Sequence, residues 1–521
     1  MNRVVRTENG LIRGLPASDP RITSFKGIPF AAPPVGENRW RAPQPCGDWE
    51  GELKAFEFGP ISMQDKGKPG RDNFWSREWA VDFDLPMSED CLYLNVWAPA
   101  DGYAVGDAEQ YREHEEDPVK EAGHLPVFVW FFGGGLQVGN TAEMEFDGER
   151  IARRGVVVVT VNYRLNAFGF LSHPDLTRED PAAPANFGFL DQQFALKWVK
   201  RNIAAFGGDP ENITIGGQSS GGMSVCVHLA NPANRGLFRQ AVLESAVFIP
   251  AYAPKFIFGT DLAGGEEHGK VFLEKLGVHS IAEARKIPAE VILETANQMP
   301  PHWFDSVIDG VYMKCPAFEW FLQPGHIDCP VFMSSTDIEM LMRPRNLKSR
   351  EDLEQLAAGL EGLDRSAFLK LFEGLEDPDA ILNAAEVSGI EMAGHAMAKT
   401  LKSPVWMSRF SAEIPGWDHP GCFHSSDIWF YFENLAKCWR VFTGKHYDLS
   451  RQMCDYWANF MRTGDPNGRG SDGKMLPVWP RLDEKEPWRM EFGEMSERTK
   501  ADPSPVMKVL LDAFAVSHGL K

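Results

Sequence analysis

The sequence lacks the features that mark several large classes of protein. Its longest apolar runs, at 125–132 and 156–159, are far shorter than the roughly 20 residues that a transmembrane helix needs. It has no basic stripe, and 53 basic against 73 acidic side chains give a net charge of −20. Such a charge repels both nucleic-acid backbones and anionic lipid surfaces. We therefore expect a chain that binds neither nucleic acid nor membrane.

Metal-binding and targeting patterns are missing as well. The eight cysteines are scattered, and none forms a Cys-x-x-Cys or a Cys/His cluster with zinc spacing, so we expect no metal and no cofactor. The first residues are polar and charged and contain no apolar run of the kind that a secretory signal has. These absences predict reduced thiols in a cytoplasmic protein.

What the sequence does contain is an alternation of short apolar runs with longer helical patterns. Runs typical of strands lie at 92–97, 126–132, 155–162, 213–216, 241–245, 330–335 and 404–410. Apolar residues at helical spacing follow at 191–205, and a second helix is expected over 222–229. Because these strands are apolar throughout and alternate with helices, they predict an α/β fold with a mostly parallel sheet covered on both faces.

The domain organisation has to be inferred from the linkers. A chain of 521 residues would allow about three domains, but no Pro/Ser-rich linker and no internal repeat divides it. We expect a single domain, 1–521, with helical cap insertions at about 251–325 and 343–403 and a charged surface loop at 101–124. The insertions would cover the carboxyl ends of the strands, where α/β sheets bind ligands.

The sharpest local motif is a G-x-S-x-G sequence at 217–221, with Ser219 at its centre. It directly follows an expected strand and precedes an expected helix. On such a corner, small flanking residues let the serine adopt a strained conformation that projects its hydroxyl. With 48 glycines in the chain, a chance match in a loop is the alternative. The position between strand and helix favours a nucleophilic serine.

A nucleophilic serine needs N–H donors for the oxyanion that develops on its substrate. Three glycines follow Phe132 at the end of another expected strand, where esterases carry such donors. Glycine lets the backbone turn its N–H groups toward a ligand without side-chain obstruction. We expect the N–H groups of Gly134, Gly135 and Ser220 to form the oxyanion hole, although a tight structural turn would also explain the triplet.

The serine also needs a base and an acid. Among 13 histidines, His424 stands out because it lies in a turn of small residues between a Pro/Gly loop and an aromatic segment. A carboxylate at a strand's carboxyl end would point into the same crevice. Glu339 and Asp337 both follow the expected strand 330–335, and spacing alone does not separate them.

Several further segments together carry a family resemblance. They read FKGIPFA at 25–31, PPVG at 33–36, SEDCLYLNV at 88–96, NYRL at 162–165, FGGDP at 206–210, WANF at 457–460 and TGDPN at 463–467. With the serine motif, these segments resemble the type-B carboxylesterases, the family of cholinesterases and para-nitrobenzyl esterases. The resemblance implies an α/β-hydrolase fold. It also implies Ser219 as nucleophile, His424 as base, and Glu339 as acid, nine residues after a proline at 330 as in the family.

The chain departs from the family pattern at several positions. Gln218 and Ser220 replace the usual Glu and Ala, and Phe132 replaces the usual His or Tyr before the glycines. The family often pairs the cysteine matching Cys91 with an upstream cysteine, whose place is taken here by a serine. That loss fits a bacterial-type enzyme with reduced thiols, while Cys46 stays open as a substitute partner.

The resemblance implies a serine carboxylesterase that hydrolyses small-molecule carboxylic esters through an acyl-enzyme. A feruloyl or other plant-ester esterase of the same fold is one alternative, and a non-catalytic cholinesterase-like binding protein is another. Trp303 and Phe132 are candidates for lining the substrate pocket, although Trp303 could equally be a core aromatic. The acyl and alcohol groups of the substrate are not predictable from the sequence.

Overall fold

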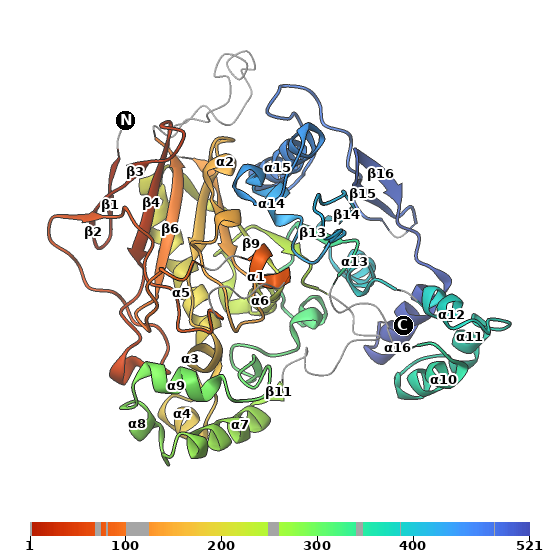
Figure 1. The fold of residues 1–521 in the computed structure, drawn as a ribbon, viewed down its shortest axis with the longest axis horizontal. Helices are drawn as coiled ribbons and strands as arrows, with labels where there is room; N and C mark the ends of the chain where they lie inside the picture. Colours follow the sequence, from red (N-terminus) through yellow and green to blue (C-terminus); the bar gives the residue numbers. More distant parts are fainter. Residues whose placement is uncertain are drawn as a thin grey trace.

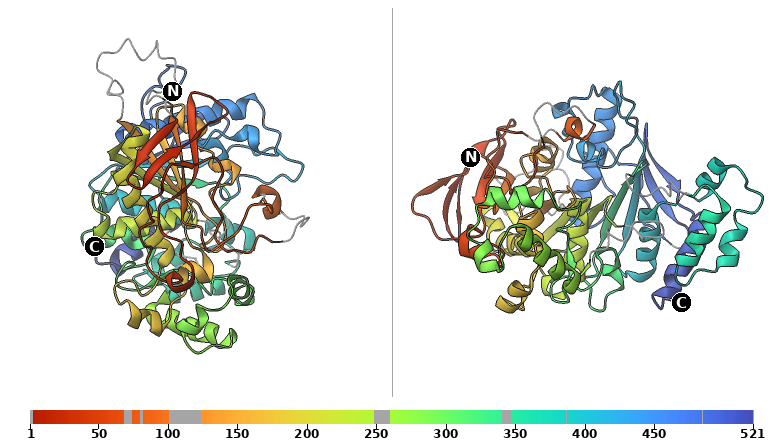
Figure 2. Two further views of the ribbon diagram at one scale, coloured as in Figure 1. Left: turned by 90° about the vertical axis from the view of Figure 1, so that its left-hand side faces the viewer. Right: turned by 60° about the horizontal axis from the view of Figure 1, so that its bottom comes forward.

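One large sheet organises the molecule. The computed structural model describes residues 3–67, 74–79, 82–100, 124–247, 260–339, 347–385, 387–483 and 485–520. Eleven of its strands form one sheet in the order β16-β15-β14-β13-β10-β9-β7-β8-β6-β4-β3. Figures 1 and 2 show this sheet running from the N-terminal strands at one edge to the C-terminal strands at the other.

The strands of this sheet have the following bounds. They are β3 (Leu15–Pro16), β4 (Ile22–Pro29), β6 (Tyr93–Pro99), β7 (Leu125–Phe131), β8 (Val157–Val161), β9 (Gly208–Gln218), β10 (Gln240–Glu244), β13 (Val331–Thr336), β14 (Val405–Phe410), β15 (Trp488–Phe492) and β16 (Ser496–Lys500). From β8 to β15 all neighbours are parallel. The strands beyond β8 and β15 pair antiparallel at both edges. The predicted, mostly parallel sheet is confirmed.

Helices cover both faces of the central strands, as β7 illustrates. Phe128 on β7 lies 5.2 Å from the ring of Trp457 on α15 (Gly444–Thr463). Phe131, an odd number of residues further on, instead lies 5.4 Å from His228 on α6 (Ser220–Ala230). Since successive side chains of a strand point to opposite faces, α15 and α6 flank the sheet on opposite sides. This explains why β7 and β8 are apolar at nearly every position and fully buried.

The remaining helices flank or extend this core. They include α2 (Glu149–Ala152), α3 (Asn166–Phe170), α4 (Pro174–Glu179), α5 (Phe187–Asn202), α13 (Gly389–Thr400), α14 (Ile428–Tyr431) and α16 (Pro505–Ser517). The short helix α1 (Phe74–Glu78) and a small sheet of β1 (Val4–Thr7), β2 (Gly10–Arg13) and β5 (Glu52–Lys54) complete the N-terminal part.

Two groups of helices lie where cap insertions were expected. The first comprises α7 (Leu262–Lys275), α8 (Ile281–Ala284) and α9 (Ala289–Ala296), which gather beside α4 in Figure 1. The second comprises α10 (Arg350–Gly359), α11 (Arg365–Lys370) and α12 (Pro378–Ala384), which lie near α16. The predicted loop 101–124 falls almost wholly outside the described residues, as do 251–259 of the first insertion. A single domain stays a prediction.

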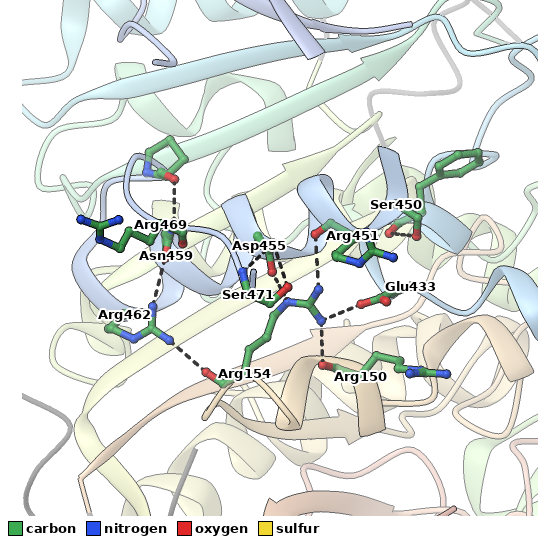
Figure 3. A network of polar contacts seen from close by, with 12 residues as sticks. Arg150, Arg154, Glu433, Ser450, Arg451, Asp455, Asn459, Arg462, Arg469 and Ser471 are labelled. Carbon is green, nitrogen blue, oxygen red and sulfur yellow. Dashed lines mark hydrogen bonds and ion pairs between the residues drawn. The ribbon is translucent and has the colours of Figure 1, made fainter. Parts of the chain in front are cut away.

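A largely buried ion-pair network ties the last third of the chain to the sheet (Figure 3). Arg154, just after α2, contacts Asp455 on α15 at 2.5 Å and Glu433 at 2.7 Å. Arg462 on α15 donates in turn to the backbone carbonyl oxygen of Arg154 at 2.9 Å. Because these groups are largely buried and mutually compensated, they fix how α15 sits across β7 and β9.

Candidate active site

Ser219 occupies a strained corner between β9 and α6, as its motif predicts. Its backbone has φ 55° and ψ −126°, and its N–H donates to the carbonyl oxygen of Glu244 on the neighbouring strand at 2.9 Å. A Cβ on Gly221 would lie 2.0 Å from the carbonyl oxygen of Phe131, and one on Gly217 would lie 2.4 Å from the Gly221 backbone. The two glycines are therefore a steric requirement of the corner, which holds the serine half-exposed.

His424 and Glu339 lie together at the end of β13. The Nδ1 of His424 is 2.5 Å from Oε2 of Glu339. A parallel bridge joins Ile338 and Phe423, so the residues that follow them, Glu339 and His424, lie side by side. Asp337, the competing carboxylate, is exposed and lies 3.9 Å from the guanidinium of Arg409. The structure thus pairs His424 with Glu339 and places Asp337 elsewhere.

The charge of His424 and several hydrogen bonds lower the pKa of the Glu339 carboxyl despite its burial. Burial raises the pKa of Glu339, but the charge of His424 and hydrogen bonds from His424, Ser245 and Thr336 outweigh it and lower this pKa. The Ser245 hydroxyl donates at 2.5 Å and the Thr336 N–H at 2.8 Å. For His424, burial lowers the pKa, but the charge and hydrogen bond of Glu339 outweigh it and raise this pKa. The imidazole is therefore a stronger base than a free one.

Gln218, the residue before Ser219, contacts the other side of the same imidazole. Its side-chain nitrogen lies 3.1 Å from Nε2 of His424. With Nδ1–H donating to Glu339, Nε2 is an acceptor, and the Gln218 amide can donate to it. The sequence showed that Gln218 departs from the family pattern, but the contact itself spans 206 positions and was missed.

The glycine triplet forms a tight loop against the serine corner. Gly134 and Gly135 have φ angles of 108° and 64°, in the region that favours glycine. A Cβ on Gly134 would lie 2.1 Å from the carbonyl oxygen of Val138. The N–H of Leu136 donates to the side-chain oxygen of Ser220 at 3.1 Å, so the serine at this position ties the loop to α6.

The two predicted pocket residues lie in different surroundings. Phe132 is 1% exposed, and its ring stacks on Tyr163 with centroids 4.4 Å apart. The Tyr163 hydroxyl donates to the carbonyl oxygen of Phe132 at 2.7 Å. This core position favours a role of Phe132 in holding the glycine loop. A substrate contact for Phe132 stays a prediction, and its burial does not support that contact. Trp303 is half-buried and lines a cavity of about 240 Å³, and a substrate contact for it stays a prediction.

A parallel sheet flanked by helices, with a serine on a strained strand-to-helix corner, defines the α/β-hydrolase class. Comparison with known proteins narrows the class. The sequence model of the carboxylesterase family matches residues 1–352 and 383–505. The chain belongs to this family. The unmatched internal segment 353–382 carries most of α10 and all of α11.

The chain resembles several characterised esterases along most of its length. It is 30% identical to a fumonisin B1 esterase of Sphingopyxis macrogoltabida over 501 residues, which cover 92% of this chain and 85% of that protein. It is 31% identical to the para-nitrobenzyl esterase of Bacillus subtilis (strain 168), with 89% of this chain and 91% of that one covered. A solved PNB esterase superposes with a TM-score of 0.75 at 28% identity, covering 98% of this chain and 100% of the other.

Three general features complete the description. Among the described residues, no group of three or more His, Cys, Asp or Glu side chains is arranged to hold a metal ion. In the same part of the chain, no helix is long and apolar enough to cross a membrane. All eight cysteines are free thiols, including Cys46 and Cys91.

Proposed function

We propose a serine mechanism for this chain, which its family and its esterase relatives show to be a carboxylic ester hydrolase. We propose that Ser219 is its nucleophile, His424 its general base and Glu339 the acid that orients the base. The observation that carries this assignment is the short His424–Glu339 contact, which lies beside the corner that bears Ser219 because His424 also contacts the neighbouring Gln218. An imidazole with a raised pKa, held by a buried carboxylate, is the arrangement that activates a serine hydroxyl.

The reaction proceeds in two half-reactions. His424 takes the proton from the Ser219 hydroxyl, which attacks the ester carbonyl carbon. The N–H groups of Gly134, Gly135 and Ser220 stabilise the oxyanion of the tetrahedral intermediate. The alcohol then leaves with the proton from His424, and water repeats the sequence on the acyl-enzyme.

Replacement of the serine tests the assignment. Ser219→Ala should lower kcat for 4-nitrophenyl acetate by about 10⁴- to 10⁶-fold and abolish labelling by a fluorophosphonate. Ser224→Ala, one helical turn along α6, is the matched control and should keep both labelling and turnover. Turnover by Ser219→Ala at the normal rate would refute the assignment.

Two alternatives to this assignment are a non-catalytic binding protein and an esterase of plant esters. A non-catalytic binding protein is contradicted by the esterase relatives, which match most of the chain. A feruloyl or plant-ester esterase stays open, and turnover of methyl ferulate beside 4-nitrophenyl esters of increasing chain length tests it. We further propose a bacterial-type enzyme of the cytoplasm, which the free thiols support.

A further inference from the structure

The glycine loop, residues 133–139, packs directly against the serine corner. A Cβ on Gly133 would lie 3.1 Å from the Cβ of Ser219. The three residues that follow, Gly134, Gly135 and Leu136, have φ angles of 108°, 64° and 61°. Leu136 carries a side chain in the left-handed region, where a residue other than glycine is strained. The contacts around Leu136 have to hold it in that conformation.

Hydrogen bonds hold the backbone of Leu136 from two sides. Its N–H donates to the Oγ of Ser220 at 3.1 Å, and its carbonyl oxygen accepts the N–H of Asn166 at 2.8 Å. Leu136 and Ser220 are both buried, so water does not compete for the bond between them. A buried backbone N–H that loses its acceptor is costly. The Ser220 hydroxyl therefore stabilises the strained conformation of Leu136.

Other side chains anchor the far end of the loop. The Gln64 amide donates to the carbonyl oxygen of Gly139 at 2.9 Å and accepts the N–H of the same residue at 2.8 Å. The Asn166 side chain donates to the carbonyl oxygen of Gln137 at 3.2 Å. These anchors lie away from the glycines, whereas the bond to Ser220 begins at the residue directly after Gly135. It joins the loop to the residue directly after the nucleophile.

Ser220 thus takes part in both halves of the proposed oxyanion hole. Its backbone N–H is one of the three donors, and its hydroxyl holds the loop that carries the other two, Gly134 and Gly135. Donors stabilise an oxyanion only when they already point at the place where it forms. A shift of the loop relative to the corner would change the spacing of the donors.

We propose that the Ser220 hydroxyl is a positioning group that sets the spacing of the oxyanion hole through its hydrogen bond with Leu136. The proposal rests on the function assigned to Ser219 above. The hydroxyl acts through the loop and needs no contact with the substrate. Both half-reactions form an oxyanion, which exists only in the tetrahedral species. Loss of the hydroxyl should therefore lower kcat and kcat/KM equally.

Ser220→Ala tests the proposal because it removes the hydroxyl and keeps the backbone N–H. Alanine is smaller and is the usual residue of the family here, so this variant should fold. We expect kcat and kcat/KM for 4-nitrophenyl acetate to fall by about 10- to 100-fold, the range of a small misplacement of catalytic groups. A trifluoromethyl ketone forms a tetrahedral adduct with a reactive serine, so its Ki should rise by the same factor.

Two further variants separate positioning from general stability. Ser224→Ala is the matched control, because it deletes another buried hydroxyl of α6, which donates to the Ser220 carbonyl oxygen at 2.9 Å. It should lower the temperature of thermal unfolding, as Ser220→Ala does, but leave kcat and the ketone Ki unchanged. Ser220→Thr supplies a hydroxyl oxygen at the same place and should recover most of the lost kcat.

The outcomes are distinguishable from a failure of the assigned function. An unchanged kcat and Ki in Ser220→Ala would overturn the proposal, as would an equal loss of kcat in Ser224→Ala. Stoichiometric labelling of Ser220→Ala by a fluorophosphonate would show in either case that Ser219 keeps its role. Normal turnover by Ser219→Ala would instead overturn the assigned function.

Discussion

The contact between Gln218 and His424 predicts how the pH dependence of the enzyme can be shifted. A neutral amide lies 3.1 Å from Nε2 of the proposed base. Gln218→Glu would place a carboxylate of almost the same shape there. This carboxylate stabilises the protonated imidazole, whose pKa Glu339 already raises. Because His424 acts as a base only when it is neutral, the acid limb of the kcat/KM profile should move to higher pH.

The size of the shift follows from the distance. At 3.1 Å, two unit charges interact by about 1.3 kcal/mol even with the dielectric constant of bulk water, which corresponds to about one pKa unit. Gln218 is only 4% exposed, so the effective dielectric constant is lower and the interaction stronger. Opposite charges at such separations typically shift a pKa by about 1 to 3 units. We expect an upward displacement of the acid limb in that range.

The assay is the pH profile of kcat/KM for a neutral 4-nitrophenyl ester. Gln44→Glu adds the same negative charge at an exposed position and should leave the limb in place. Gln218→Met keeps the volume without the amide; because it only removes a donor to neutral Nε2 and adds no charge, it should raise the pKa of His424 less than Gln218→Glu does. An acid limb of Gln218→Glu that coincides with that of the unmodified enzyme would refute the reasoning, because the charge would then not act on the base.

Two more variants probe the loop and the buried carboxyls. Gly134→Ala brings a Cβ to 2.1 Å from the Val138 carbonyl oxygen and so displaces the loop. We expect kcat to fall by about 10²- to 10³-fold, while thermal unfolding still shows a folded protein. An unchanged kcat would mean that Gly134 is not part of the oxyanion hole. Glu244 is fully buried, with no hydrogen-bond partner for its side-chain oxygens in the described structure. Burial and the charges of Asp427 and Glu339 raise the pKa of Glu244. The folded state then binds more protons than the unfolded one above pH ~4.5, and stability falls as pH rises toward the folded pKa. Glu244→Gln lacks this loss, so its stability relative to the original chain should grow between pH 6 and pH 9 in chemical denaturation; a constant difference would contradict the raised pKa.

The central strands were predictable because burial on both faces leaves a plain signal. β7 and β8 are apolar at nearly every position, and no polar alternation competes with that pattern. The edge strands were missed for the opposite reason. β16 reads SERTK and is mostly exposed, so its pairing with β15 depends on backbone hydrogen bonds that leave no trace in the apolar pattern. Because such exposed strands form the edges of the sheet, its antiparallel edges could not be predicted from the apolar pattern.

The local part of the site was predictable and the long-range part was not. The corner at Ser219 depends on glycines two positions away, and a short motif records them. The choice between Asp337 and Glu339 depends on a bridge between Ile338 and Phe423, which are far apart in the sequence. From the residues alone that choice stayed open, and only the family resemblance favoured Glu339.

The buried carboxyls around His424 show why hydrogen-bond donors decide which of them can act as the acid. Glu339, Asp427 and Glu244 are all buried, but only Glu339 accepts from a histidine, a hydroxyl and a backbone N–H together. The pKa of Glu339 is lowered, whereas burial and the charge of Glu339 raise the pKa of Asp427 to about 7. The charge of Asp427 in turn raises the pKa of His424. As pH rises through 7, Asp427 ionises and makes His424 harder to deprotonate, so the two groups titrate together. The acid limb should therefore be broader than the titration of one proton, and Gln218→Glu should displace the limb as a whole.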